Sequence, residues 1–350
     1  MRFKSLIRLV DQSGVRGSSI EYRGELDGLR AIAITGVVLN HVGLLAQGGW
    51  GVDLFFLLSG YLITKILMEK TSQRGRLRVF YIRRFARLVP IAMIYLMYSV
   101  VVLTLQQKPI PGEALLSSIF YYRNFYELKA GPWDHYWSLS AEEQFYLLWP
   151  VALVFFARSS RLRSLQYISF GVFFSFLLLG QVLVISDPGI NSIFQHVLVR
   201  PSILLAGCAL AIFETRNTMS SKKRFAASSL VLGLILCILE FFSSTNIWTF
   251  GVLLIGASLL IDSERNGNLL KRMLRVRPLP QVGLLSYSIY IWHFECIRIA
   301  KILSSDDQVI MGATFFALLV LFSLVSFNFI EKPIQRFIVN RFSSPISKSK

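Results

Sequence analysis

An apolar stretch near the start of the chain carries two side chains that could take part in acid–base chemistry and anion binding. Arg30 lies near the beginning of this stretch and His41 lies eleven residues later, near its end. In a helix, that spacing is three turns plus roughly 20°, so both side chains share one face, about 16 Å apart along the axis. A histidine can serve as a general base, and an arginine can hold an anion. Because both are costly in hydrocarbon, their shared face indicates a site.

Both residues also have an interpretation without chemistry. His41 could lie in the membrane interface at the end of a helix, and Arg30 could extend its charged group to the cytoplasmic headgroups. Neither residue decides the question alone. The choice depends on whether other polar side chains are expected at the same depth, and therefore on the helices that carry them.

The composition is that of a polytopic membrane protein rather than a soluble one. Of the 350 residues, 54% are hydrophobic and only 16% are charged, and the mean hydropathy is positive. The net charge of +17 would suit nucleic-acid binding, but cytoplasmic loops beside an anionic leaflet explain it better. Cys208, Cys237 and Cys296 lie in apolar runs without a CxxC pair, so we expect buried thiols and no zinc site.

Apolar windows of about 20 residues predict an all-α fold with about ten transmembrane helices. The predicted spans are residues 27–45, 50–68, 88–105, 143–157, 165–185, 193–213, 224–242, 246–261, 279–301 and 308–330.

Lysine and arginine gather in alternate loops, and this sets the expected orientation. The loops after the second, fourth, sixth and eighth spans are basic, whereas residues 46–49 and 243–245 hold no cation. By the positive-inside rule, both termini are then cytoplasmic. The N-terminal segment also lacks the apolar core of a signal peptide. We therefore expect a cytoplasmic N-terminal segment, a transmembrane domain and a cytoplasmic tail, at residues 1–24, 25–333 and 334–350.

This orientation gives a depth to each polar residue inside a predicted helix. Asp53 opens the second span, Glu142 and Glu143 open the fourth, and both spans run inward from the outer side. His293 falls in the outer half of the ninth span. These side chains are therefore expected at about the depth of His41. A base, carboxylates that orient it and dry surroundings are what a catalytic site needs.

Structural roles stay open for several of these residues. Ser140 and Glu143 have the spacing of a capping box at a helix N-terminus, and Asp53 could cap or pair locally. Pro90 is expected to help set the start of the third span. Three arginines would anchor the inner end of that span: Arg83, Arg84 and Arg87. Three tryptophans fit an interfacial aromatic belt: Trp137, Trp149 and Trp292.

Six stretches occur together in the order of a known family. They are Asp27–Arg30 with His41, Gly51–Gly60, Arg83–Pro90, Trp137–Pro150, Ser286–His293 and Glu331–Pro333. With them the chain resembles the acyltransferase 3 family, the membrane-bound O-acyltransferases of bacterial surface carbohydrates, from about residue 25 to residue 333. Tyr61 stands where phenylalanine is common, which we expect to matter little. The frequent proline after the tryptophan–histidine pair is absent, which bears on the local geometry of the ninth span.

The resemblance implies an enzyme of the bacterial inner membrane that moves an acyl group, usually acetyl, from cytoplasmic acyl-coenzyme A to a sugar hydroxyl. Acetyl-coenzyme A is then the expected co-substrate, with no metal. The expected partners are membrane lipid and a glycan at the outer face, such as O-antigen or exopolysaccharide, and not nucleic acid. The acceptor sugar, the size of the acyl group and the oligomeric state stay open. Some relatives carry a fused extracytoplasmic esterase-like domain, and we expect this chain to be the stand-alone kind.

Three groups of residues take roles in this scheme. The donor would be held by Arg30, Arg83, Arg84 and Arg87. The catalytic group is His41, as general base or acyl acceptor, with Asp53, Glu142 and Glu143 to orient and stabilise it. The expected substrate-binding residues are Ser59, Tyr136, Trp137, Trp292 and His293. The rival hypothesis is a transporter or flippase of lipid-linked sugars, because such proteins also need charged residues inside the membrane. A scaffold protein is a weaker alternative, because it would not need polar residues at one depth.

Overall fold

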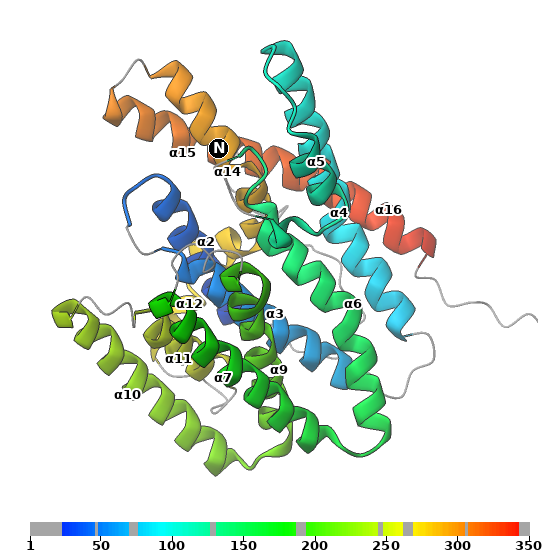
Figure 1. The fold of residues 1–350 in the computed structure, drawn as a ribbon, viewed down its shortest axis with the longest axis vertical. Helices are drawn as coiled ribbons and strands as arrows, with labels where there is room; N and C mark the ends of the chain where they lie inside the picture. The colour runs from blue at the N-terminus through cyan, green and yellow to red at the C-terminus, as the bar shows by residue number, and fades with distance from the viewer. Residues whose placement is uncertain are drawn as a thin grey trace, which may run out of the picture. The chain divides into compact units, whose positions relative to one another are not determined.

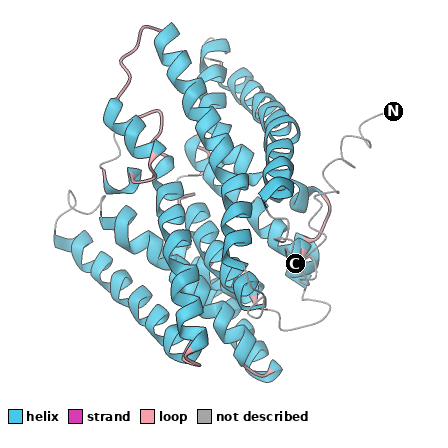
Figure 2. Cartoon of the chain, turned by 90° about the vertical axis from the view of Figure 1, so that its right-hand side faces the viewer, coloured by secondary structure: helices cyan, strands magenta, loops and turns pink. Residues whose placement is uncertain are grey.

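The computed structural model describes residues 23–45, 48–69, 76–126, 131–186, 194–243, 248–261, 269–304 and 307–342. These residues form helices joined by turns, with no strand among them (Figures 1 and 2). The all-α prediction is therefore confirmed for this part of the chain. Three predicted features lie wholly or largely outside the described residues: the N-terminal segment up to residue 22, the loop at 187–193 and the tail after residue 342.

The main helices are named here in chain order. They are α2 (Gly24–His41), α3 (Trp50–Glu69), α4 (Arg76–Leu105), α5 (Gly112–Ile119), α6 (Tyr136–Arg158), α7 (Leu162–Ser186), α9 (Arg200–Arg216), α10 (Met219–Ser243), α11 (Trp248–Leu260), α12 (Leu269–Leu274), α13 (Pro278–Leu284), α14 (Ser286–Leu303), α15 (Gln308–Val325) and α16 (Lys332–Phe342). Three short segments have other helical turns: η1 (Arg123–Phe125) is a 3-10 turn, and η2 (Gln195–Val199) and η3 (Ser326–Glu331) are wide π turns.

The chain is a multi-pass membrane protein. Within the described residues, each predicted span overlaps at least one helix. Among the described residues, five helical segments are long and apolar enough to cross a membrane: Trp50–Met68, Leu77–Leu105, Leu162–Gly180, Gln195–Arg216 and Gln308–Phe342. Helix α2 carries Glu25, Asp27 and Arg30 within its 18 residues, whereas each of these five segments contains an apolar stretch of 18 residues with at most two charged residues. The count of ten spans and the cytoplasmic termini stay predictions.

The predicted limits of several spans differ from those of the helices. Helix α4 begins at Arg76 rather than near residue 88, and Pro90 lies inside it instead of helping to start it. The basic segment before Pro90 contains good helix formers and no glycine, so the helix extends through it. The ninth predicted span is interrupted at Leu285, between α13 and α14.

The chain divides into two compact units. Unit 1 is built from α4, α14, α15 and α16, and unit 2 from α2, α3 and the helices from α5 to α13. Of the expected site residues, unit 2 holds those of α2, α3 and α6. Unit 1 holds the three arginines of α4 together with Trp292 and His293.

Side-chain contacts fix the relative directions of the helices within unit 2. Asp53 and Tyr61 of α3 bind Arg200 and Glu214 of α9 in the same order, so these two helices are parallel. Helix α6 is parallel to α3 as well, because Ser59 binds Glu142 and Thr64 binds Trp149. Helix α2 is antiparallel to α3. Alternating membrane spans require these directions for the second, fourth and sixth spans.

Two glycines let α3 and α9 approach each other at backbone distance. A Cβ atom on Gly60 would lie 1.9 Å from the carbonyl oxygen of Leu204, and one on Gly207 would lie 2.2 Å from that of Leu57. Thr64 and Cys208 bind the carbonyl oxygen of Gly60, at 2.8 Å and 3.4 Å. Small residues at such contacts gain dispersion energy and weak polar contacts, which stabilise helix pairs in lipid.

Candidate active site

Helix α3 provides a measure of depth in unit 2, because its polar partners change from turn to turn. Just before it, the amide of Gly48 donates to Asn40 Oδ1 at 3.1 Å. Farther along, Asp53 binds Arg200 and Ser59 binds Glu142. At about 1.5 Å per residue, Asp53 lies about 8 Å beyond Gly48, and Ser59 lies about 9 Å beyond Asp53.

Asp53 and Glu142 therefore lie at different levels along α3. The sequence had suggested that both share the depth of His41, and the contacts along α3 do not place them so. The reason lies in α6, which begins at Tyr136. Glu142 is thus already in the second turn of the helix, rather than at its mouth. Ser140 lies inside the helix too, and its hydroxyl accepts a hydrogen bond from the backbone amide of Arg123 at 3.1 Å. The predicted capping box does not form the end of this helix.

His41 is the last residue of α2, and its side chain is exposed. The helix stops there because the chain turns at Val42 and Gly43, where Gly43 has a φ of 78°. Asn40 ties this end of α2 to the chain just before α3 through its bond to Gly48. The imidazole is therefore held at an accessible end of unit 2, where a substrate could approach it.

One turn into α3, at the level of Asp53, several side chains gather around Arg200. Arg200 Nε donates to Asp53 Oδ1 at 2.7 Å, and its Nη2 donates to the carbonyl oxygen of Gly49 at 2.5 Å. Its guanidinium lies over the ring of Trp137, 5.1 Å from the centroid. The Trp137 ring also contacts His196 at a centroid distance of 4.4 Å and Phe56 at 5.8 Å. The sequence reasoning missed Arg200, although a lone arginine followed by proline inside an apolar window was a usable signal.

The predicted substrate-binding residues of α6 are packed inside unit 2. Tyr136 is fully buried against His135, and Trp137 is 6% exposed among the neighbours just described. Ser59, by contrast, is half-buried and donates to Glu142 at 2.8 Å. Glu143 is also half-buried and lies within electrostatic reach of Tyr121.

Arg30 pairs with a residue one turn earlier on its own helix. Its Nη1 lies 2.9 Å from Asp27 Oδ1, and the Arg30 side chain is 20% exposed. The arginine that was expected to mark a donor route is thus partly neutralised by Asp27. Its remaining exposure leaves it accessible to a second anion.

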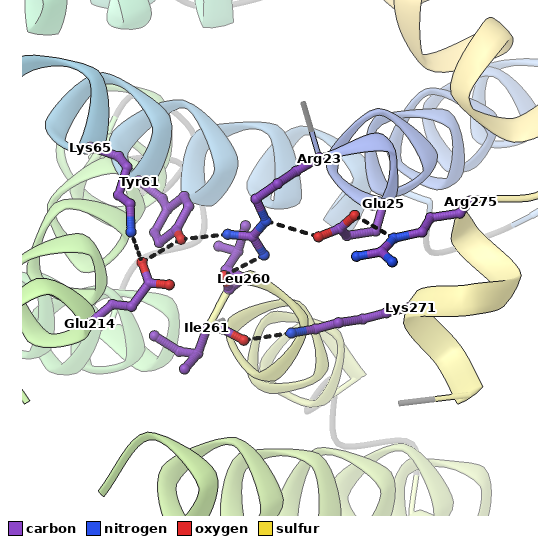
Figure 3. A network of polar contacts seen from close by, with 9 residues as sticks. All are labelled: Arg23, Glu25, Tyr61, Lys65, Glu214, Leu260, Ile261, Lys271 and Arg275. Carbon is purple, nitrogen blue, oxygen red and sulfur yellow. Dashed lines mark hydrogen bonds and ion pairs between the residues drawn. The ribbon is translucent and has the colours of Figure 1, made fainter. Parts of the chain in front are cut away.

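A network of polar and charged side chains connects the helices at the end of unit 2 that is opposite His41 (Figure 3). Tyr61 donates to Glu214 at 2.6 Å and accepts from Arg23 at 3.0 Å. Lys65 lies 2.7 Å from the same carboxylate. Glu25 completes the network, because Arg23 and Arg275 each lie 2.8 Å from one of its oxygens.

This network holds the start of α2 to the ends of α3 and α9. Tyr61 and Glu214 are fully buried, so the hydroxyl and the carboxylate each need a polar partner to remain there. Arg23 also donates to the carbonyl oxygen of Leu260, and the buried Lys271 donates to that of Ile261 (Figure 3). The expectation that a tyrosine at position 61 matters little is not supported by these contacts. Glu214 was detectable in sequence as a carboxylate at the end of the sixth apolar window.

Replacing Tyr61 by phenylalanine is expected to lower the free energy of unfolding by about 1–3 kcal/mol, because a buried carboxylate and a guanidinium lose a shared partner. Tyr167→Phe is the matched control, since that tyrosine is 66% exposed on α7. Denaturant unfolding of both variants in detergent measures the difference. Equal stability of Tyr61→Phe and the wild type would show that the hydroxyl contributes nothing.

Unit 1 contains the remaining expected site residues. The three arginines of the third motif are half-buried inside α4: Arg83, Arg84 and Arg87. Trp292 packs against Tyr95 and Tyr98, each at a centroid distance of 5.4 Å. His293 is fully buried, with its Nδ1 2.6 Å from the carbonyl oxygen of Tyr290. These contacts give Trp292 and His293 a packing role within unit 1.

Further polar contacts in unit 1 come from residues that were not expected. Glu295 accepts from Tyr98 at 2.6 Å, and it also accepts from Nε and Nη2 of Arg298, at 2.9 Å and 2.5 Å. Glu331 accepts hydrogen bonds from Ser288 and Ser326. Across the described part of both units, no group of three histidine, cysteine or acidic residues is arranged to hold a metal ion.

The helical fold, the accessible histidine and the buried ion pairs define a class of multi-pass membrane protein with polar sites between helices. Comparison with known proteins gives the family. The model of the acyltransferase domain family, acyltransferase 3, matches residues 23–329, so the chain belongs to this family. The family predicted from the six motifs is thus confirmed.

Named relatives agree with this assignment. The chain is 33% identical to a Bacillus subtilis protein provisionally named peptidoglycan O-acetyltransferase YrhL, over 89% of this chain and 54% of that protein. It is 30% identical to the peptidoglycan O-acetyltransferase OatA of Listeria monocytogenes, over 91% of this chain and 56% of the relative. Identity to the O-acetyltransferase OatA of Staphylococcus aureus is 32%, over 91% and 58%. The chain therefore spans just over half the length of these relatives. No solved structure matches it.

Proposed function

We propose that the chain is a membrane O-acetyltransferase that moves an acetyl group from cytoplasmic acetyl-coenzyme A to a hydroxyl of a cell-envelope glycan. The observation that carries the proposal is the acyltransferase match over residues 23–329, which includes His41 and every arginine assigned to the donor. Two relatives are named peptidoglycan O-acetyltransferases. Their names favour a peptidoglycan sugar as acceptor over O-antigen or exopolysaccharide.

In the proposed reaction, His41 removes the proton from the sugar hydroxyl while the oxygen attacks the thioester carbonyl. The carbon–sulfur bond breaks, and the imidazolium returns the proton to the departing thiolate, so no net proton is released. The alternative is an acetyl-histidine that forms first and is then attacked by the sugar. Direct base catalysis is preferred, and acetylated His41 accumulating in the absence of acceptor would replace it with the covalent route.

The other residues support this step from different depths. Asp53 acts through its pair with Arg200. Ser59 lies farther along α3 and binds Glu142 of α6, at the level where the pantetheine arm would pass. Arg30 remains on the same helix face as His41 and is assigned to the donor. Tyr136, Trp137, Trp292 and His293 are assigned to supporting positions, because all four are buried.

The test is transfer of labelled acetyl groups in proteoliposomes that contain the full chain, acetyl-coenzyme A on one side and peptidoglycan fragments on the other. We expect label in the glycan only when protein, donor and acceptor are all present. Mass spectrometry of the envelope glycan, with and without the chain in cells, then locates the acetylated hydroxyl. Movement of lipid-linked sugar without any dependence on acetyl-coenzyme A would instead establish the transporter hypothesis.

Removing the three arginines of α4 is expected to weaken coenzyme A binding by at least about tenfold. The phosphates are polyanionic, and each charge-assisted hydrogen bond contributes about 1.5–3 kcal/mol. The variant is Arg83→Ala/Arg84→Ala/Arg87→Ala, and titration calorimetry in detergent measures the affinity. Arg158→Ala/Arg161→Ala/Arg163→Ala removes the same charge from another predicted cytoplasmic segment and should bind normally. Unchanged affinity in the first variant would reduce these arginines to topological anchors.

A further inference from the structure

Asp53 occupies a position at which a carboxylate needs a permanent partner. It lies in the first turn of α3, and its side chain is only 6% exposed. A buried carboxylate loses the solvation of water and is retained only when it is paired and hydrogen-bonded. Arg200 supplies that pair through Nε, and the same guanidinium reaches the carbonyl oxygen of Gly49 through Nη2. One side chain of α9 therefore holds both the carboxylate and the backbone at the start of α3.

The same guanidinium also orders the start of α6. It lies over Trp137, whose ring is closed in by His196 and Phe56. Trp137 precedes Glu142 on α6 by little more than one turn, so its position influences where that carboxylate meets Ser59. Arginine suits this place better than lysine, because a planar guanidinium can bind a carboxylate with its edge and an aromatic ring with its face.

The segment before Arg200 has an unusual backbone. Gln195–Val199 forms a π turn, and α9 begins directly after it with Arg200 followed by a proline. Such turns are rare and occur often at functional sites, because they change the direction in which side chains point. Here the turn brings His196 and Arg200 against the same ring of Trp137.

We infer that Arg200 is a positioning residue of the proposed acetyl transfer, acting through Asp53 and Trp137 on the end of unit 2 that carries His41. This inference rests on the proposed function. Arg200 is not assigned to contact the donor or the acceptor. Arg200 instead holds the starts of α3 and α6 in fixed positions relative to each other, so that the electrostatic environment of the reacting groups stays fixed.

Steady-state acetyl transfer by the purified full chain tests the inference, with rates expressed per folded protein. Misplacement of reacting groups by about 1 Å can lower the rate by about 100-fold. Arg200→Ala is therefore expected to lower kcat about 30- to 100-fold, with KM for acetyl-coenzyme A changed less than about threefold. Arg200→Lys should recover part of the loss, because it keeps the charge but not the planar contact. The double variant Arg200→Ala/Asp53→Asn should be about as slow as the slower single variant, since contacting residues are not additive.

Arg123 and Asp134 provide a matched control, because they form another arginine–aspartate pair in unit 2, at 2.5 Å. Arg123→Ala should lower the yield of folded protein and leave kcat within about threefold of the wild type, as expected for a pair with a structural role. If Arg200→Ala behaves like Arg123→Ala, or if the effects of Arg200→Ala and Asp53→Asn multiply, the inference is wrong while the proposed function stands. If the wild type transfers no acetyl group, the proposed function is overturned, and this role with it.

Discussion

Replacing His41 by alanine should reduce the rate of acetyl transfer by a factor of about 10² to 10⁴, which is the range that a positioned general base contributes. The side chain is at the end of α2 and exposed, so its removal leaves no buried cavity. Folded protein should therefore reach the membrane in normal amounts. Affinity for coenzyme A should also be unchanged, because the donor is assigned to Arg30 and the three arginines of α4, and none of these is altered.

The control for this variant is Leu44→Ala, which removes an exposed side chain from the turn just after α2. It should transfer acetyl groups at the wild-type rate. His41→Gln keeps a polar side chain at the same place but cannot accept a proton near neutral pH, so it should be as slow as the alanine variant. Transfer at the wild-type rate by either His41 variant would remove the histidine from the mechanism.

The second large effect is expected on stability, from a methyl group added at Gly60. Because a Cβ atom there would lie 1.9 Å from the carbonyl oxygen of Leu204, α3 and α9 must move apart. Overpacking usually costs about 1–3 kcal/mol, and a clash with backbone is at the upper end because no side chain can rotate away. Gly60→Ala is expected to lower the free energy of unfolding by about 3 kcal/mol or more, as measured by unfolding in detergent.

Gly171→Ala gives the matched control, because no neighbouring atom of the described residues lies within 4 Å of a Cβ atom built on that glycine of α7. It should be neutral, or stabilising by about 0.5–1 kcal/mol, since alanine favours helix. Gly207→Ala should resemble Gly60→Ala, because its Cβ would lie 2.2 Å from the carbonyl oxygen of Leu57. A Gly60→Ala protein as stable as Gly171→Ala would mean that the two helices are not packed as described.

The helices of this protein could be predicted from hydropathy because each needs an apolar stretch of a certain length, and that requirement is local. The family could be predicted because its motifs are short and contiguous. The boundaries of α4 and α6 could not, since the arginines before Pro90 and the residues from Tyr136 continue a helix beyond its apolar part. Hydropathy detects the membrane-facing part of a helix and not its ends.

The partners of the polar residues were hidden for a different reason. Asp53 could be singled out in the sequence as a carboxylate inside an apolar window, but its partner Arg200 is 147 residues away. Likewise, Tyr61 stands where phenylalanine is common, yet its hydroxyl joins the Arg23 guanidinium to the carboxylate of Glu214, which lies 153 residues later. Depth alone cannot specify such pairs, because it gives the level of a residue in the membrane and not the helix that faces it.

The long sequence separation within the network of Figure 3 has a consequence for biosynthesis. Arg275 binds Glu25 across 250 residues, and Arg23 binds the backbone of Leu260 across 237. At about 5–20 residues per second, a ribosome needs about 12–50 s to make the intervening chain. During that time α2 has Arg23 beside Glu25, but the second guanidinium does not yet exist. This end of unit 2 can therefore close only late in translation, and nascent chains arrested before α12 should expose it to membrane proteases.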